Sequence, residues 1–299
     1  LVTNQGLYET TSGTNNFNGG VRNLGTFTSN DTLTIGGTGG ILEGNLDDAI
    51  INVNTDPVYG NFNADTSSSL SNDNDFDGIF HASNGGCVAA WIYPKSDGEN
   101  DYGRIAAKGN ATDASDGWSF HVREEASGAV KVKFAYAWAS ATAAWTTTST
   151  VIPLNAWSHI AVTYTPSGTG VNPVIYVNGT SVGAVGAGLT EDVAPSGAND
   201  AQEDGHDLYV GNNYGGARGF DGYMMDLKIY KNKAVTATNI LKMASKINVE
   251  EDAPDMPTGS NLQGWFKFNA STTADSSGEG NNLTASNMGS IVYDAFSVN

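Results

Sequence analysis

The sequence has few charged side chains, and basic ones are especially scarce. Charged residues make up 15% of the 299 positions, against roughly a quarter in an average soluble domain. Lys and Arg number 14 against 32 Asp and Glu, so the formal net charge is −18. This balance disfavours nucleic acids and anionic membrane surfaces as partners. It fits either a protein that binds cations or one that its charge simply keeps soluble.

Cysteine is also nearly absent. Cys87 is the only one in the chain, so no internal disulfide can form. It stands in the apolar run GCVAAWIY, which predicts a buried small side chain and not a reactive thiol. No apolar segment of the sequence reaches the roughly 18 residues that a membrane-spanning helix needs. Because the sequence starts at Leu1 without an initiator methionine, we expect a processed, secreted or virion protein, or part of a longer product.

Residues 1–50 differ in composition from the rest of the chain. Arg22 is their only basic residue, and Asn, Gly and Thr dominate. Residues 25–37 read GTFTSNDTLTIGG, which predicts a β-hairpin: one strand ends at Phe27, the chain turns at 29–31, and Leu33 and Ile35 alternate on the returning strand. A hairpin of this size cannot fold alone. We therefore expect an N-terminal β arm.

Strand patterns become regular between residues 58 and 240. Short runs of β-forming residues recur every 10–15 positions or so, separated by Gly, Asn, Asp or Pro, which is typical of an antiparallel sandwich. Residues 130–136, VKVKFAY, alternate with period two and should place their lysines on the solvent face. Only residues 236–246 look helical, with Ile240, Leu241 and Met243 as the docking face.

Residues 208–240 contain two strand-like runs on either side of a glycine-rich bend. The first run is LYV at 208–210, glycines from 211 to 219 favour a change of chain direction, and the second run covers 224–230. This segment resembles the penultimate hairpin of laminin-G-like, concanavalin A-like jelly rolls. The runs AAWIYP at 89–94, WSHIAVTY at 157–164 and IYVNG at 175–179 resemble other strands of that family, in the same order.

The resemblance implies an all-β fold, an antiparallel concanavalin A-like jelly-roll sandwich with an N-terminal β arm. The arm would cover residues 1–50 and the laminin-G-like jelly roll residues 51–250. Residues 251–299 follow an acidic, proline-rich linker and contain WFKF at 265–268 and DSSGEGNN at 275–282. These two motifs resemble the first strand and loop of the family, yet here they come last. About 45 residues are too few for a second sandwich, so these strands should complete the same sandwich or that of a neighbouring subunit.

Several aspartates are candidate ligands for calcium. Residues 73–78 read DNDFDG, and the alternate carboxylates of Asp73, Asp75 and Asp77 match the start of a calcium loop. Position twelve of that loop is Asn84, where a Glu is expected, so a plain turn between strands is the alternative. The resemblance implies a rim site as well, whose candidate ligands are Asp113, Asp116, Asp204, Asp207 and Asp226. For Asp226 the simpler partner is Arg218, Lys228 or a backbone amide.

Aromatic side chains offer a second kind of candidate site. Trp138 and Trp145 lie in WASATAAW, a stretch of small residues with little core pattern. Exposed tryptophans can stack on sugar rings, and Tyr102 and Tyr214 would be their companions in a carbohydrate site. Alternatively, both tryptophans cap the core at a loop.

The sequence lacks the usual marks of catalysis. Concanavalin A-like glucanases place carboxylates on alternate residues of one strand, but Glu124, Glu125 and the acidic residues at 250–252 have the wrong periodicity. The four histidines (His81, His121, His159 and His206) include no pair at metal-ligand spacing, and no nucleophile elbow is present. We therefore expect a protein that is not an enzyme.

Two functions remain open from the sequence. In the first, the chain is a structural or decoration protein of an extracellular assembly, in particular a bacteriophage virion, because its short Thr- and Gly-rich arm resembles modules of tailed-phage proteins. Its partners would then be other virion subunits, including copies of itself in a homo-oligomer. In the second, it is a secreted or cell-surface lectin that binds glycans with or without calcium.

Overall fold

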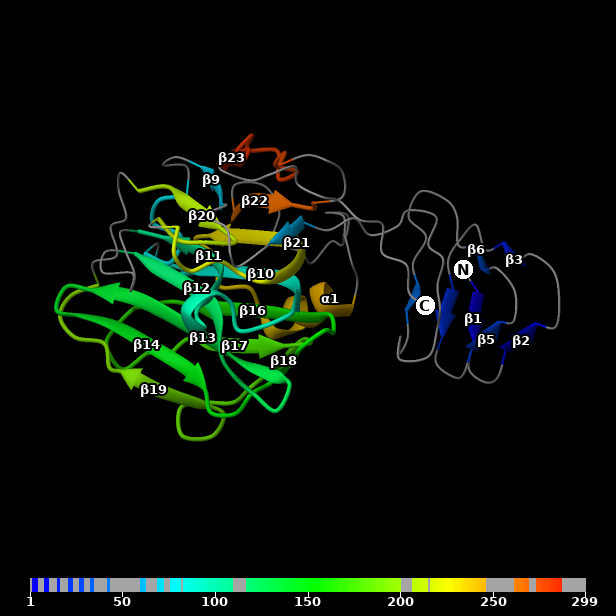
Figure 1. Ribbon diagram of the computed structural model, residues 1–299, viewed down its shortest axis with the longest axis horizontal. Helices are drawn as coiled ribbons and strands as arrows, with labels where there is room; N and C mark the ends of the chain where they lie inside the picture. Colours follow the sequence, from blue (N-terminus) through cyan, green and yellow to red (C-terminus); the bar gives the residue numbers. More distant parts are fainter. Residues whose placement is uncertain are drawn as a thin grey trace. The chain divides into compact units, whose positions relative to one another are not determined.

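The computed structural model divides the chain into two units, Leu1–Val58 together with Asp294–Asn299, and Tyr59–Tyr293 (Figure 1). In the first unit the structure describes seven short strands, and in the second it describes residues 60–62, 69–72, 76–81, 83–109, 117–199, 206–214, 216–245, 261–268 and 273–286. The strands of the first unit are β1 (Val2–Asn4), β2 (Tyr8–Thr10), β3 (Asn15–Asn16), β4 (Val21–Asn23), β5 (Phe27–Ser29), β6 (Leu33–Thr34) and β7 (Leu42–Glu43).

In the first unit each of the first four strands pairs in parallel with the third strand after it. The ladders are β1-β4-β7, β2-β5 and β3-β6. Val2 pairs with Val21 and Tyr8 with Phe27, 19 residues further along in both cases. This is the pairing of a parallel β-solenoid, in which successive coils stack. The predicted hairpin at 25–37 is therefore wrong: β5 and β6 pair with earlier strands and not with each other, because the coil repeat and not the local turn sets the register.

The second unit contains two antiparallel sheets that pack as a sandwich. The seven-stranded sheet has the order β18-β17-β16-β10-β21-β22, with β8 also pairing with β21. The nine-stranded sheet has the order β19-β14-β13-β12-β11-β20-β9-β23, with β15 also pairing with β13. This is the predicted all-β jelly-roll class.

The bounds of these strands are as follows. The seven-stranded sheet contains β8 (Gly60–Phe62), β10 (Gly86–Pro94), β16 (Ser158–Tyr164), β17 (Val174–Val177), β18 (Thr180–Ser181), β21 (Gly222–Lys231) and β22 (Leu262–Phe266). The nine-stranded sheet contains β9 (Ser69–Asn72), β11 (Gly103–Lys108), β12 (Trp118–Ala126), β13 (Ala129–Trp138), β14 (Ala141–Thr147), β15 (Ile152–Pro153), β19 (Leu189–Val193), β20 (Leu208–Val210) and β23 (Thr284–Ser286).

Alternation along β13 shows how the sequence builds the core. Val130, Val132, Phe134 and Tyr136 are fully buried between the sheets, while the lysines between them lie on the outer face, as the sequence predicted. The ring of Phe134 packs against Phe80, with the two centroids 5.0 Å apart. Each apolar side chain of this size contributes roughly 1.5–3 kcal/mol when it is fully buried.

The outer faces of the two sheets differ in what lies on them. The helix α1 (Ala237–Ser245) packs on the seven-stranded sheet, where Ile240 and Met243 join a second apolar cluster that includes Ala161 of β16 and Tyr230 of β21 (Figure 1). The predicted helix at 236–246 is thus confirmed, but Leu241, which was expected on its docking face, is 53% exposed. The short 3₁₀ turn η1 (Glu99–Asp101) contacts β12 of the nine-stranded sheet.

The glycine-rich bend at 211–221 carries the chain from one sheet to the other. β20 pairs with β11 and β9 in the nine-stranded sheet, whereas β21 pairs with β10 in the seven-stranded sheet. The predicted hairpin of residues 208–230 is therefore not a hairpin: its two strands do not pair. A sandwich crossing needs the same turn residues as a hairpin, so local sequence alone did not separate the two.

The C-terminal segment contributes a strand to each sheet of its own chain. β22 pairs with β21, and β23 pairs with β9. Between them, the carboxylate of Asp275 accepts hydrogen bonds from the backbone N–H groups of Trp265 (2.9 Å), Ser277 (2.8 Å) and Asn281 (3.0 Å). One aspartate therefore ties the loop of the DSSG motif to the strand before it.

Candidate functional site

The two tryptophans predicted to stack on sugars lie in the core. Trp145 is fully buried and donates its indole N–H to Asn172 Oδ1 at 2.8 Å, and Trp138 is 5% exposed. The small residues between them are not a loop: Trp138 pairs with Ala141, and the chain forms the β13–β14 hairpin there. The interpretation of these two side chains as a sugar platform is therefore wrong, and their alternative as core residues holds.

The candidate calcium ligands do not gather in the part of the chain that the structure describes. Among those residues, no group of three or more His, Cys, Asp or Glu side chains could hold a metal ion. Asp77 forms an ion pair with Lys108 at 2.6 Å, which supplies the charge that a cation would otherwise provide. Asp207 directly precedes β20. The other predicted ligands of these loops, Asp73, Asp75, Asp113, Asp116 and Asp204, lie outside the described residues.

Asp226 has two protein partners in place of a metal. Its Oδ2 lies 2.6 Å from the ammonium of Lys228, and its Oδ1 accepts the indole N–H of Trp265 at 2.6 Å. The backbone of Asp226 has φ of 54°, at an irregularity in the pairing of β21 with β10, and Asp tolerates this left-handed conformation. Lys228 is thus the partner that the sequence suggested as the simpler choice.

A cluster of cations surrounds Tyr102 on the outer side of the nine-stranded sheet. The guanidinium carbons of Arg218, Arg123 and Arg104 lie 4.8, 4.9 and 5.7 Å from the centroid of its half-buried ring. The His121 ring lies 5.6 Å from the same centroid. A cation over an aromatic face is attracted by the ring quadrupole. We refer to these five residues, Tyr102, Arg104, His121, Arg123 and Arg218, as the Tyr102 cluster.

Strand pairing and a tight loop bring this cluster together. Arg104 of β11 pairs with His121 of β12, and Arg123 follows two residues later on the same face. Tyr102 precedes β11, and the loop that carries it is tight. Gly98 and Gly103 approach each other so closely that a Cβ atom at Gly98 would lie 2.3 Å from the Cα of Gly103. Both features are local, and they fix four members of the cluster.

The glycine-rich bend supplies the fifth member, Arg218. The backbone N–H of Arg104 donates to the backbone oxygen of Arg218 at 3.0 Å. The Arg218 N–H donates in turn to Oδ1 of the buried Asn212 at 3.0 Å, and the Gly219 N–H donates to Glu99 Oε2 at 3.1 Å. The bend is therefore tied to both β11 and η1, which holds the Arg218 side chain over the ring.

His121 is neutral and carries its ring proton on Nε2. Arg104 Nη1 contacts His121 Nδ1, and because a guanidinium can only donate, Nδ1 must accept and the ring proton resides on Nε2. Burial, together with the positive charges of Arg104, Lys133, Arg123 and Arg218, holds the pKa of His121 well below its usual value. His121 therefore stays uncharged at neutral pH and offers Nε2–H as a hydrogen-bond donor.

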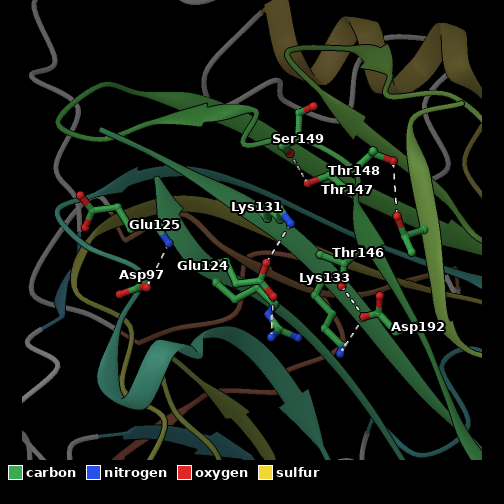
Figure 2. Close-up of polar contacts among 12 residues, drawn as sticks. Asp97, Glu124, Glu125, Lys131, Lys133, Thr146, Thr147, Thr148, Ser149 and Asp192 are labelled. Carbon is green, nitrogen blue, oxygen red and sulfur yellow. Dashed lines mark hydrogen bonds and ion pairs between the residues drawn. The ribbon is translucent and has the colours of Figure 1, made fainter. Parts of the chain in front are cut away.

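Next to the cluster, the outer face of β12, β13 and β14 carries a network of paired charges (Figure 2). Glu124 contacts Arg123 at 2.6 Å and Lys131 at 2.8 Å. Asp192 contacts Lys133 at 3.0 Å and accepts the Thr146 hydroxyl at 2.6 Å. In this network the lysines are neutralised, in contrast to Arg218, which has no ion pair in the part of the chain that the structure describes.

Residues 62–241 match the sequence model of the concanavalin A-like lectin/glucanases superfamily, which is more than half of the chain. The chain belongs to this superfamily. Its sandwich therefore has the fold of a lectin- and glucanase-type module.

Solved structures of similar fold include proteins of several kinds. The CBM40 module of the Ruminococcus gnavus IT-sialidase, bound to α2,3-sialyllactose, is 12% identical with a TM-score of 0.41, over 59% of this chain and 93% of that one. The full-length tailspike protein 2 of an Escherichia coli O157:H7 bacteriophage is 12% identical with a TM-score of 0.43, over 83% of this chain and 38% of that one. Leech intramolecular trans-sialidase is 14% identical with a TM-score of 0.39, over 56% and 24%. No curated protein matches the sequence. These likenesses are too distant to transfer a ligand or an activity to this chain.

The two predicted tyrosines are on the surface, unlike the tryptophans. Tyr214, in the bend, is 57% exposed, and its ring lies 6.1 Å from both Tyr209 and His206. Tyr209 lies between the core residues Leu208 and Val210, so its side chain is on the outer face of the lectin-type sandwich. Tyr102 and Tyr214 thus remain candidate sugar contacts.

A concavity lies at one edge of the sandwich, away from the Tyr102 cluster. It has a volume of about 430 Å³, and its lining includes Thr148, Ser149, Thr180 and Ser181. The lining contains no aromatic and no charged side chain. It therefore offers hydroxyl groups but no ring on which a sugar could stack, and the Tyr102 cluster is the stronger candidate.

Sequence reasoning missed the arginines of the site. The whole chain has four arginines, Arg22, Arg104, Arg123 and Arg218, and three of them belong to the Tyr102 cluster. The signal that could have revealed them is this concentration of a rare residue type around a predicted surface tyrosine. As to membranes, none of the helices that the structure describes is long and apolar enough to span a bilayer.

Proposed function

We propose that this chain is a lectin-like module that binds glycans and acts by binding, not by catalysis. The observation that supports this function best is the Tyr102 cluster, in which a half-buried aromatic ring is held among hydrogen-bond donors. The cluster lies on the outer face of the nine-stranded sheet, whereas α1 covers the outer face of the seven-stranded sheet. The proposal places the glycan against Tyr102 and the arginines beside it and extends it towards Tyr209 and Tyr214.

The chemistry of sugars fits such a surface. The apolar face of a sugar ring packs on an aromatic side chain, and the hydroxyl groups at its edge form hydrogen bonds. Tyr102 supplies a ring that its neighbours hold in place, and Arg123 and Arg218 supply planar groups of donors beside it. Because these groups are already positioned, little entropy is lost when a glycan binds.

Substitution of Tyr102 tests the proposal. We expect Tyr102→Ala to weaken glycan binding at least about tenfold, because one stacked ring contributes on the order of 1.5 kcal/mol. Tyr223→Ala is the matched control, since Tyr223 is also a half-buried tyrosine under a cation, Lys95, at 4.1 Å, but it lies on the other sheet. Binding is measured on a glycan array and then by calorimetry. A wild-type protein that retains no glycan, or equal losses in both variants, would contradict the proposal.

Calcium dependence can be measured in the same assay. We expect binding to survive EDTA, because the described groups of the Tyr102 cluster are donors and cations, which need no metal to meet a glycan. Loss of binding with EDTA would instead assign calcium to loops such as the one that carries Asp113 and Asp116.

A second role concerns the place where the module is displayed. We propose that the first unit attaches the lectin-like sandwich to an extracellular assembly, such as a bacteriophage virion, in which copies of the chain lie side by side. The parallel solenoid of β1 to β7 supports this role, because the ends of such a stack leave strand edges that further strands can join. Mass measurement of the full-length protein tests it: a defined oligomer or a stoichiometric particle is expected, and a monomer at all concentrations contradicts it.

A further inference from the structure

We propose that the Tyr102 cluster binds the carboxylate of an acidic sugar, so that the module selects anionic glycans over neutral ones. This inference rests on the glycan binding proposed above and names the class of glycan. It assigns Arg218 and Arg123 as the residues that contact the carboxylate and Tyr102 as the ring that packs against the sugar.

The Tyr102 cluster holds an excess of positive charge. The chain carries a net charge of −18, yet three of its four arginines surround one ring. In the described part of the chain, Arg123 shares the carboxylate of Glu124 with Lys131, and Arg218 has none. Like charges brought together repel one another, so this arrangement costs stability unless an anion joins it. A cluster of mutually repelling cations, in a protein that has few cations, is suited to an anionic ligand.

The Tyr102 cluster also has donors without acceptors. Three N–H groups have no hydrogen-bond partner within the described structure although water cannot reach them: Nε of Arg123, Nε of Arg218 and Nε2 of His121. His121 is 1% exposed, and its Nε2 carries the ring proton because Arg104 occupies Nδ1. Buried polar groups are normally paired. The cluster thus has more donors than acceptors, and a ligand that meets the exposed parts of Arg123 and Arg218 has to supply acceptors.

The geometry of arginine selects a carboxylate among the possible acceptors. A guanidinium presents parallel N–H groups that match the two oxygens of a carboxylate, and such charge-assisted bonds are about twice as strong as neutral ones. A sugar hydroxyl accepts weakly and presents one oxygen. Arg123 and Arg218 both remain partly exposed beside Tyr102, with the Arg123 side chain 17% exposed, so a carboxylate on a sugar ring can reach them from solvent.

Paired glycans and one arginine variant test the inference. The array carries oligosaccharides that end in a uronic or sialic acid, the neutral parents that lack the acid, and sulfated forms of the same parents. We expect the wild-type protein to prefer the carboxylated forms, and Arg218→Gln to weaken their binding about tenfold to a hundredfold. Binding to any neutral parent should fall by much less, because the Gln side chain can still donate to a sugar hydroxyl. The matched control is Lys95→Gln, which removes a cation stacked on Tyr223 outside the cluster and should change neither class.

The outcomes separate this inference from the proposed function. If the wild-type protein binds neutral parents as well as acidic glycans, or if Arg218→Gln behaves like Lys95→Gln, carboxylate selection is overturned while glycan binding stands. Equal binding of sulfated forms overturns the preference for carboxylate and leaves a general anion site. If no glycan is retained, both fail. Calorimetry with the best carboxylated glycan at two salt concentrations supplies a second measure, since screening should weaken binding to the wild type more than to Arg218→Gln.

Discussion

Each sheet of the sandwich buries cationic side chains, but only one sheet neutralises them fully. In the seven-stranded sheet, Lys228 is 2% exposed and is paired with Asp226, whose other oxygen accepts the indole N–H of Trp265. In the nine-stranded sheet, the Tyr102 cluster holds three arginines, and Nε of Arg123 and Nε of Arg218 lack acceptors within the described structure.

The difference separates a structural charge from a charge kept for a ligand. A buried ion pair whose atoms are all paired gives a defined local geometry, and it loses much stability if one partner is removed. A cluster with unpaired donors adds little to stability. Its cations repel each other, and its polar groups lose hydrogen bonds to water without gaining protein partners. The two places should therefore respond in opposite ways to the loss of one charge.

The largest effect is expected from Asp226→Asn. This change keeps a residue that tolerates the left-handed backbone and an oxygen for Trp265, but it leaves the Lys228 ammonium buried without a counter-charge. We expect the free energy of unfolding to fall by about 3–5 kcal/mol. Urea unfolding followed by tryptophan fluorescence measures it.

The double variant Asp226→Asn, Lys228→Met is the control. It removes both charges and should recover most of the lost stability, since an apolar side chain of similar length no longer needs a partner. If the single variant is as stable as the wild type, Lys228 does not depend on this pair and the contrast between the sheets fails.

An intermediate effect is expected from pH at His159, which lies on β16. Burial, and then the charge of Lys228, lowers the pKa of His159 from 6.5 to about 3. Below pH 6.5 the unfolded chain takes up a proton that the folded chain refuses until about pH 3, so stability is lost as the pH falls through this window. Between pH 7 and pH 5 the loss should be about 2 kcal/mol.

Comparison with His159→Gln isolates this contribution from that of the carboxylates. The variant should lose about 2 kcal/mol less than the wild type over the same pH range. Identical pH profiles would show that His159 can be protonated in the folded protein. His121 should show the same direction in the free protein, and a bound anion should reduce its contribution because the anion favours the protonated ring.

The smallest effect on stability is expected from Arg218→Gln, the variant with the largest effect on binding. Removing one cation relieves repulsion with Arg104 and Arg123, so the free energy of unfolding should change by less than about 1 kcal/mol, in either direction. A loss as large as that of Asp226→Asn would mean that Arg218 stabilises the fold. The claim that its charge serves a ligand would then fail.

The sequence predicted those parts of the fold that depend on local pattern. The alternation of VKVKFAY placed Val130 and Phe134 inside and the lysines outside, and the apolar spacing at 236–246 predicted α1. The motifs at 89–94 and 157–164 form the central pair β10 and β16. In each case the side chains themselves, through burial on one face, determine the structure.

Features that depend on distant pairing escaped the prediction. Trp138 and Trp145 looked like loop residues because the alanines around them hide the strand pattern, but cross-strand neighbours bury them. Arg104, Arg123 and Arg218 are far apart in the sequence, and only the register of β11 with β12 and the path of the bend bring them to one ring. The parallel pairing of β2 with β5 likewise needs a repeat to be recognised 19 residues along.

That repeat gives the first unit a property that the sandwich lacks. Val2, Asn4 and Tyr8 are followed by Val21, Asn23 and Phe27 at the corresponding positions of the next coil. Adjacent strands of a sheet lie about 4.8 Å apart, so one added or deleted coil would change the length of the stack by that step and leave its cross-section the same. Insertion or deletion of whole repeats could therefore change the length of this unit in fixed steps, while both of its ends stay the same.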